Sequence, residues 1–220
     1  MSSLITLIKV LSISTSLIAS GGILSLSLFD IPLLKSQPAT RSLPQIRWLF
    51  SRGSHIFPTA AILSSTGFIY LSITSLSPSE SFLDVISNIA GNSPTVNGYL
   101  LAGVLSAAIG PFTQFAMIPT NFELIERNEE LGGARSEESA KKAEGKGKVG
   151  GKTARESVDG ERDLNQFGDL SGPQEKTERE GNEEDDRAVE ELLERFKWLN
   201  LVRSVLIGCG GVVGLLTAIV

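Results

Sequence analysis

The chain has 220 residues, of which 41% are hydrophobic and 20% charged, and its formal net charge is −5. A single cysteine excludes an internal disulfide. Metal and haem centres use His, Cys, Met and carboxylate ligands, and the chain has one His, one Cys and two Met, so we expect no cofactor. The acidic residues are segregated, with only three of 25 before Glu123, so the net charge does not indicate a nucleic-acid partner.

Four apolar runs cover residues 4–34, 56–76, 99–118 and 198–220. An α-helix rises about 1.5 Å per residue, so about 20 apolar residues cross a hydrocarbon core of about 30 Å. Each run is near or above that length. The sequence therefore predicts an all-α, integral membrane four-helix bundle with the lipid bilayer as its partner. The first six residues carry no basic side chain, and the first run exceeds a signal-peptide core, so we expect a retained helix.

The chain divides by composition into three regions. Residues 1–126 hold three transmembrane helices and a short amphipathic helix at 82–89, which is too short to span and suits the membrane interface. Residues 127–187 are rich in Gly, Glu, Lys, Arg, Asp and Ser and cannot bury enough apolar surface to fold, so we expect a disordered charged insert. Residues 188–220 form an amphipathic lead-in and the fourth transmembrane helix.

Small residues recur at four-residue spacing in the first and fourth runs. Ser12, Ser16 and Ser20 share one face of a helix, and Gly210 and Gly214 share another. Small residues let helix backbones approach closely inside a membrane. The glycines of the fourth helix are equally suited to internal packing and to a homo-oligomer.

The short loops differ in charge, which predicts orientation. Residues 35–54 carry four basic side chains and no acid, whereas residues 77–98 carry two acids and no base. By the positive-inside tendency, the first loop and the charged insert face the cytosol and both termini face the lumen. We expect an endomembrane such as the endoplasmic reticulum.

Two polar groups lie at the ends of neighbouring spans. Polar side chains at such depths are costly, which makes them candidates for function. The second run begins on the side where the third run ends, so both groups are expected at one leaflet. Alternatives remain: the arginines can anchor at headgroups, Asn121 can cap a helix, and a lone His is often a boundary residue. The members are Arg47, Trp48, Arg52, His55, Phe112, Thr113, Gln114, Met117, Thr120 and Asn121.

Four segments resemble the anthrone oxygenase-like family of small four-span membrane proteins. They are GGILSL at 21–26, IPLL at 31–34, RWLFxRG at 47–53, and PFT at 111–113 followed by MxPTN at 117–121. The resemblance covers the chain except about 127–187. It implies a membrane-embedded, cofactor-independent monooxygenase of secondary metabolism that oxidises an apolar aromatic substrate, an anthrone, to a quinone with O2.

An anthrone needs a base, a group that stabilises the developing oxyanion, and an apolar slot for its rings. We assign His55 as the base because an imidazole titrates near neutral pH. Arg47 would stabilise the oxyanion, and Asn121 would orient the substrate or a peroxide. The substrate-binding residues would be Trp48, Arg52, Phe112, Thr113, Gln114, Met117 and Thr120.

Two other functions compete with an enzyme. The first is a non-enzymatic four-helix membrane module that binds lipid or partner proteins through its charged loop. The second is a small transporter or channel subunit, which is disfavoured because the spans hold few ionisable residues and no evident inverted repeat.

Overall fold

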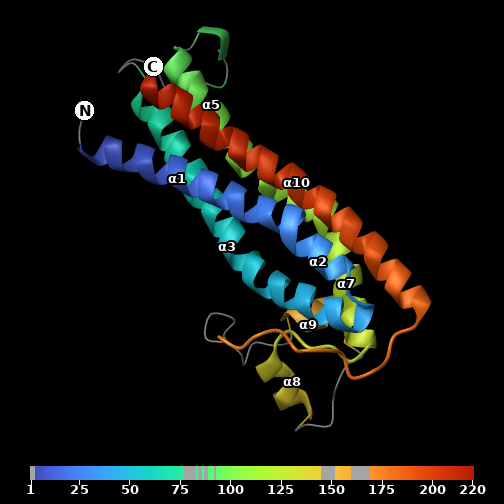
Figure 1. Cartoon of the computed structure of the whole chain (residues 1–220). Helices are drawn as coiled ribbons and strands as arrows, with labels where there is room; N and C mark the ends of the chain where they lie inside the picture. The colour runs from blue at the N-terminus through green and yellow to red at the C-terminus, as the bar shows by residue number, and fades with distance from the viewer. Residues whose placement is uncertain are drawn as a thin grey trace. The chain divides into compact units, whose positions relative to one another are not determined.

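The computed structural model describes residues 3–76, 83, 86, 89–91, 93–144, 152–159 and 169–220, and its regular structure there is helical (Figure 1). Four stretches, Ser3–Lys35, Ala39–Thr74, Pro94–Glu130 and Glu183–Ile219, are long and apolar enough to cross a membrane. The predicted all-α, four-span membrane fold is confirmed. The elements are α1 (Ser3–Ser25), η1 (Leu26–Asp30), α2 (Ile31–Lys35), α3 (Ala39–Thr74), η2 (Ile89–Gly91), α5 (Pro94–Ala107), α6 (Ile109–Phe112), η3 (Thr113–Met117), α7 (Ile118–Glu130), α8 (Glu137–Glu144), α9 (Ala154–Asp159) and α10 (Glu183–Ile219).

Two predicted segments fall partly outside the described residues. Of the interfacial helix at 82–89, the structure describes only Leu83, Ile86 and Ile89. Of the charged insert at 127–187, residues 145–151 and 160–168 lie outside the description. The described residues of the insert contain α8, α9 and the beginning of α10, which the composition did not predict.

Two prolines follow wide helical turns. The π-helical turns η1 and η3 each end just before a new helix that has a proline, Pro32 or Pro119, in its first turn. A proline lacks the N–H that an α-helix would use and clashes with the preceding turn, whereas at a helix start the missing N–H costs nothing. The wider turns therefore let spans one and three continue past these prolines instead of ending there.

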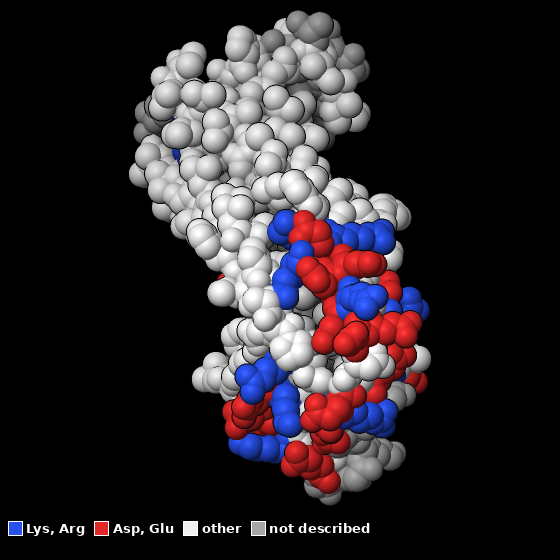
Figure 2. Space-filling view, turned by 45° about the vertical axis from the view of Figure 1, so that its right-hand side comes forward, with Lys and Arg blue, Asp and Glu red and all other residues white. Residues whose placement is uncertain are grey.

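The chain divides into two compact units. The apolar unit comprises Met1–Leu24, Phe57–Thr113 and Leu201–Val220, and the charged unit comprises Ser25–Ile56 and Gln114–Asn200. The apolar unit contains only four of the 45 charged residues in the sequence. Figure 2 shows the same segregation, since the blue and red side chains gather together while large areas are white.

Serine hydroxyls hold helices together in the apolar unit. Ser16 Oγ donates to the carbonyl of Ile207 at 2.6 Å, and Ser20 Oγ donates to the carbonyl of Ser204 at 2.9 Å. Such bonds are possible only where two helices approach closely, and they satisfy the hydroxyls inside lipid. The serine face predicted on the first span therefore serves packing.

The glycines of α10 create that close approach. An ideal Cβ on Gly210 would lie 2.9 Å from the carbonyl oxygen of Ala102, and one on Gly214 would lie 2.3 Å from the Phe68 ring. Gly208 and Gly211 face the first span in the same way. These glycines therefore contact helices of their own chain, while dimerisation through α10 stays a prediction.

Ion pairs and aromatic contacts organise the charged unit. Lys35 Nζ lies 2.8 Å from Glu194 and 3.4 Å from Glu190 of α10, and the Phe50 and Phe196 rings meet edge to face at 5.1 Å. Helix α7 ends at Glu130. Just beyond it, Gly132 has a φ of 75°, and Gly133 N donates to the carbonyl of Asn128 at 2.6 Å. That glycine cap directs the chain out of the third span.

Candidate functional site

Arg47 of α3 is buried and bound to the charged insert. Arg47 is only 3% exposed. Its Nη2 donates to the carbonyl oxygen of Ser157 at 3.1 Å and to Ser157 Oγ at 3.3 Å. Ser157 Oγ in turn donates to Glu129 Oε1 at 2.6 Å. A continuous buried polar link therefore joins α3, α9 and α7.

The short helix α9 presents Ser157 because its own N-terminus is capped. Thr153 N and Oγ1 both donate to Glu156 Oε2, at 3.0 and 2.9 Å, and Glu156 N donates back to Thr153 Oγ1 at 3.3 Å. This is the reciprocal capping box that begins a helix. Hydrogen bonds from Thr153 lower the pKa of the Glu156 carboxyl, so it is ionised when it caps.

Trp48 and Arg52 share one acceptor on a second part of the insert. Trp48 Nε1 donates to the carbonyl oxygen of Ser171 at 2.9 Å, and Arg52 Nη2 donates to it at 3.2 Å. The Arg52 guanidinium lies 5.2 Å from the centre of the Trp48 ring, a cation–π distance. These two predicted residues are therefore together, and their polar atoms face the insert.

Asp169 fixes the loop that carries this acceptor. Its Oδ1 accepts from Ser171 N at 3.0 Å and from Ser171 Oγ at 2.6 Å, and its Oδ2 accepts from Ser136 Oγ at 2.6 Å. Burial raises the pKa of Asp169, but the hydrogen bonds from Ser136 and Ser171, with the charge of Arg52, outweigh burial and lower it. The carboxylate is thus held ionised.

Residues 169–179, here called the strap, run along the first part of α3 in the direction opposite to the helix. Ser171 binds beside Trp48 and Arg52, and Thr177 N donates to the carbonyl of Thr40 at 2.8 Å. On the other side, Gln174 Oε1 accepts from Ala134 N at 2.6 Å. Six residues can reach at most roughly 20 Å, which is enough to follow the about 15 Å that ten helical residues rise. The strap therefore covers the first part of α3.

The part of the predicted site on η3 and α7 contains buried polar atoms. Met117 is fully buried, Thr120 is 1% exposed and Asn121 is half-buried. In the part of the chain that the structure describes, Thr120 Oγ1 and Asn121 Oδ1 have no hydrogen-bond partner. Buried polar atoms are rarely left unpaired, so these two are suited to a bound water or ligand.

The remaining predicted residues are dispersed. His55 lies half-buried on α3, in the charged unit, and Gln114 of η3 is exposed in the same unit. Phe112 and Thr113 belong to the apolar unit, and Thr113 Oγ1 donates to the carbonyl of Ile109 in its own helix at 2.7 Å. Whether all ten residues line one cavity stays a prediction.

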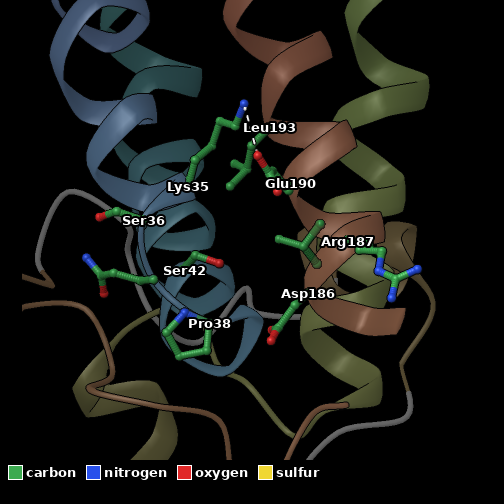
Figure 3. A pocket seen from close by; sticks show the side chains of 10 residues that line it. Lys35, Ser36, Pro38, Ser42, Asp186, Arg187, Glu190 and Leu193 are labelled. Carbon is green, nitrogen blue, oxygen red and sulfur yellow. Dashed lines mark ion pairs between the residues drawn. The ribbon is translucent and has the colours of Figure 1, made fainter. Parts of the chain in front are cut away.

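A pocket of about 390 Å³ lies elsewhere in the charged unit, between the α2–α3 turn and α10 (Figure 3). The Lys35–Glu190 ion pair closes one end, and Asp186 Oδ1 accepts from Ala39 N, the first residue of α3, at 2.6 Å. Ser42 Oγ is buried there without a hydrogen-bond partner in the described part of the chain. None of the predicted site residues lines this pocket.

Sequence reasoning missed Ser157, Glu129, Ser171 and Asp169. A usable signal existed for α9, because Thr153-Ala-Arg-Glu156 has the spacing of a capping box. Within the described ranges, no group of three or more His, Cys, Asp or Glu side chains could hold a metal ion.

A family model described as anthrone oxygenase matches residues 47–213. No curated protein and no solved structure matches the chain. The matched range includes most of α3, α5 to α7 and most of α10, and with them every residue of the predicted site. This match covers well over half of the chain, which therefore belongs to the anthrone oxygenase family.

Proposed function

We propose that this membrane protein is a cofactor-independent oxygenase that converts anthrone-like polycyclic phenols to quinones with O2, as a step of secondary metabolism. The observation that carries the proposal is the family match, which points to oxygenase chemistry. The buried arginine on α3 and the unpaired buried polar atoms of Thr120 and Asn121 support it, because they suit a small oxygen-bearing ligand.

The reaction needs no external electron source. Removing one methylene proton gives an electron-rich anthrolate, which passes electrons to O2 while a C–O bond forms and gives a hydroperoxide. Loss of the second C–H proton with cleavage of the O–O bond releases water and leaves the new carbonyl. One anthrone and one O2 thus give one quinone and one water. The protein must supply a base and stabilise the anionic oxygen.

Helix geometry supports placing His55 near Asn121. Ser157 links Arg47 to Glu129, so these positions on α3 and α7 lie at a similar level. The two helices run in opposite directions (Figure 1). His55 lies eight residues after Arg47 and Asn121 eight residues before Glu129, and eight residues rise about 12 Å in either helix. This supports placing His55, as base, and Asn121, as orienting group, in one site, and we keep Arg47 as the proposed oxyanion partner.

The hydrogen bonds of Trp48 and Arg52 limit how these residues could contact a substrate. Because Trp48 Nε1 and Arg52 Nη2 already donate to Ser171, Trp48 would contact the substrate through its ring. Met117 and Gln114 of η3 and Thr120 of α7 would line the slot within the charged unit, while Phe112 and Thr113 stay predictions from the sequence. The substrate is apolar and partitions into the bilayer, which explains why the enzyme is membrane-embedded.

The test is anthrone oxidation in membranes that contain the protein, following quinone absorbance and O2 uptake together. Anthrones oxidise slowly in air, so empty membranes give the baseline. His55→Ala, Arg47→Gln and Asn121→Ala should each lower the rate by about tenfold or more, as expected for groups in general base and oxyanion roles. Arg41→Gln is the matched control, since Arg41 is exposed on the same helix. If His55→Ala, Arg47→Gln and Asn121→Ala all keep the wild-type rate, the assignment is wrong.

We also propose that residues 35–54 and the charged insert face the cytosol and that both termini face the lumen of an endomembrane. The basic first loop supports this, and the bond from Thr177 N to the Thr40 carbonyl requires the strap and the first loop to share one side. Glycosylation reporters at either terminus should be modified. Modification of a reporter at Glu178 instead would reverse the topology.

The alternative function, a module that binds lipid or partner proteins through its charged loop, makes a different prediction. The described parts of that loop bind α3 and α7 of their own chain. A partner would have to displace those contacts. The oxygenase proposal is therefore favoured over a loop-mediated adaptor.

A further inference from the structure

We infer that Ser157 and Glu129 are positioning residues for Arg47, so that α9 of the charged insert completes the active site. The inference rests on the proposed function, because it assigns these residues to the oxyanion partner of that reaction. It changes the role of the insert from a linker between spans to a part of the enzyme.

All three residues of this link are buried. Arg47, Ser157 and Glu129 are all at most 5% exposed. A buried guanidinium or carboxylate is costly unless other groups compensate its charge. The direct bond between Ser157 Oγ and Glu129 Oε1, at 2.6 Å, brings a carboxylate into the same buried network as the guanidinium.

Ser157 fixes the orientation of the Arg47 guanidinium. Ser157 contacts one nitrogen of Arg47 twice, through its carbonyl oxygen at 3.1 Å and its Oγ at 3.3 Å. The guanidinium is planar and its donors have fixed directions, so fixing Nη2 limits the directions of the other N–H groups. Ser157 Oγ donates its own proton to Glu129, which leaves its lone pairs to accept from Arg47.

Ser157 and Glu129 come from segments far from Arg47 in the sequence. Ser157 lies 110 positions from Arg47 in the sequence and belongs to a helix of six residues, while Glu129 lies in the last turn of α7. A short helix in a polar stretch is marginal alone, so the buried link to Arg47 and Glu129 also explains why α9 is formed. Removing the insert would leave Arg47 without this partner.

The test combines kinetics with a measurement that needs no substrate. Ser157→Ala should lower kcat for anthrone oxidation about tenfold with little change in KM, which is about 1.4 kcal/mol of transition-state stabilisation. Glu129→Gln should lower kcat further, because the counter-charge is lost. Ser157→Thr keeps the hydroxyl and should restore most of the rate. Ser139→Ala, which removes a buried α8 hydroxyl that has no partner in the described part of the chain, should change nothing.

The second measurement is chemical protection of Arg47 from phenylglyoxal, read by mass spectrometry of the full chain in membranes. Modification of Arg47 by phenylglyoxal should be low in wild type and in Ser139→Ala. It should be at least several-fold higher in Ser157→Ala and Glu129→Gln. If protection falls as expected but wild type oxidises no anthrone, the positioning holds and the proposed function fails. If wild type is active while Ser157→Ala and Glu129→Gln keep both its rate and its protection of Arg47, the positioning is wrong.

Discussion

The two units of this chain hold their helices together by different kinds of contact. In the apolar unit, helices approach through glycine and serine, and hydroxyls bond to backbone carbonyls, as for Ser16 with Ile207. In the charged unit, helices and loops are joined by side chains with full charges, as for Lys35 with Glu194 and Arg47 with Ser157. Lipid offers no water to solvate an unpaired charge, whereas charged groups near water can use ion pairs and caps.

The difference predicts different sensitivities. The apolar unit should respond to changes in side-chain volume, because small residues determine how closely its helices pack. The charged unit should respond to loss of a charge or a hydrogen bond and to pH, since buried polar groups are costly when a partner is lost.

The largest effect is expected for Arg47→Gln in the charged unit. It removes a buried cation from the network of Ser157 and Glu129 and should destabilise the protein by about 3 kcal/mol, as for breaking a buried ion pair. Arg41→Gln on the same helix affects an exposed arginine 4.0 Å from Glu175 and should cost less than about 0.5 kcal/mol. Denaturant unfolding in detergent measures both. Equal losses in the free energy of unfolding for the two variants would mean that burial of Arg47 does not increase its contribution to stability.

The next effect belongs to the apolar unit. Gly210→Ala places a methyl group 2.9 Å from the backbone oxygen of Ala102, and backbone cannot move aside cheaply. We expect a loss of about 2 kcal/mol, within the range for overpacking. Gly21→Ala is the control, since its Cβ would have nothing within 4 Å and removal of a helical glycine should be neutral or slightly stabilising. Thermal unfolding that ranks Gly21→Ala as the worse variant would contradict close packing by α10.

These two units also differ in how much of them could be predicted from sequence. Hydrophobic runs and the spacing of Ser16, Ser20, Gly210 and Gly214 predicted the spans and their small-residue packing faces, because helix periodicity is a local property. The turns η1 and η3 were not predicted, since Pro32 and Pro119 read as helix ends unless a wider turn absorbs them.

The candidate site was predicted only in part. Arg47, Trp48 and Arg52 were selected as candidates because polar residues beside a span are conspicuous, and their roles stay predictions. Their partners Ser157 and Ser171 were not, because those pairings join positions more than 100 residues apart and composition alone suggested disorder. The capping boxes beginning at Thr153 and Asn182 were readable local signals of helices in that stretch.

A smaller effect is expected when the first of those caps is removed. Thr153→Ala deletes the hydroxyl that accepts from Glu156 N and should destabilise α9 by about 1 kcal/mol, as for other N-cap residues. The loss should be local, so hydrogen exchange of 154–159 should accelerate while the apolar unit keeps its protection. Unchanged exchange would show that the link from Ser157 to Arg47, and not the cap, maintains α9.

The smallest effect concerns pH and the strap. The pKa of Asp169 is lowered from its ordinary value of 3.8, so its folded form binds a proton less readily than the unfolded chain. Its contribution is therefore complete above about pH 4 and is lost as the pH falls through the lowered pKa. Proteolysis of the strap and Trp48 fluorescence should then change only at acid pH in wild type. Asp169→Asn should abolish that acid transition and give a looser strap at neutral pH. If the strap opens between pH 5 and 7 in both proteins, a group other than Asp169 titrates there. The contrast between the two units would then lose its electrostatic basis.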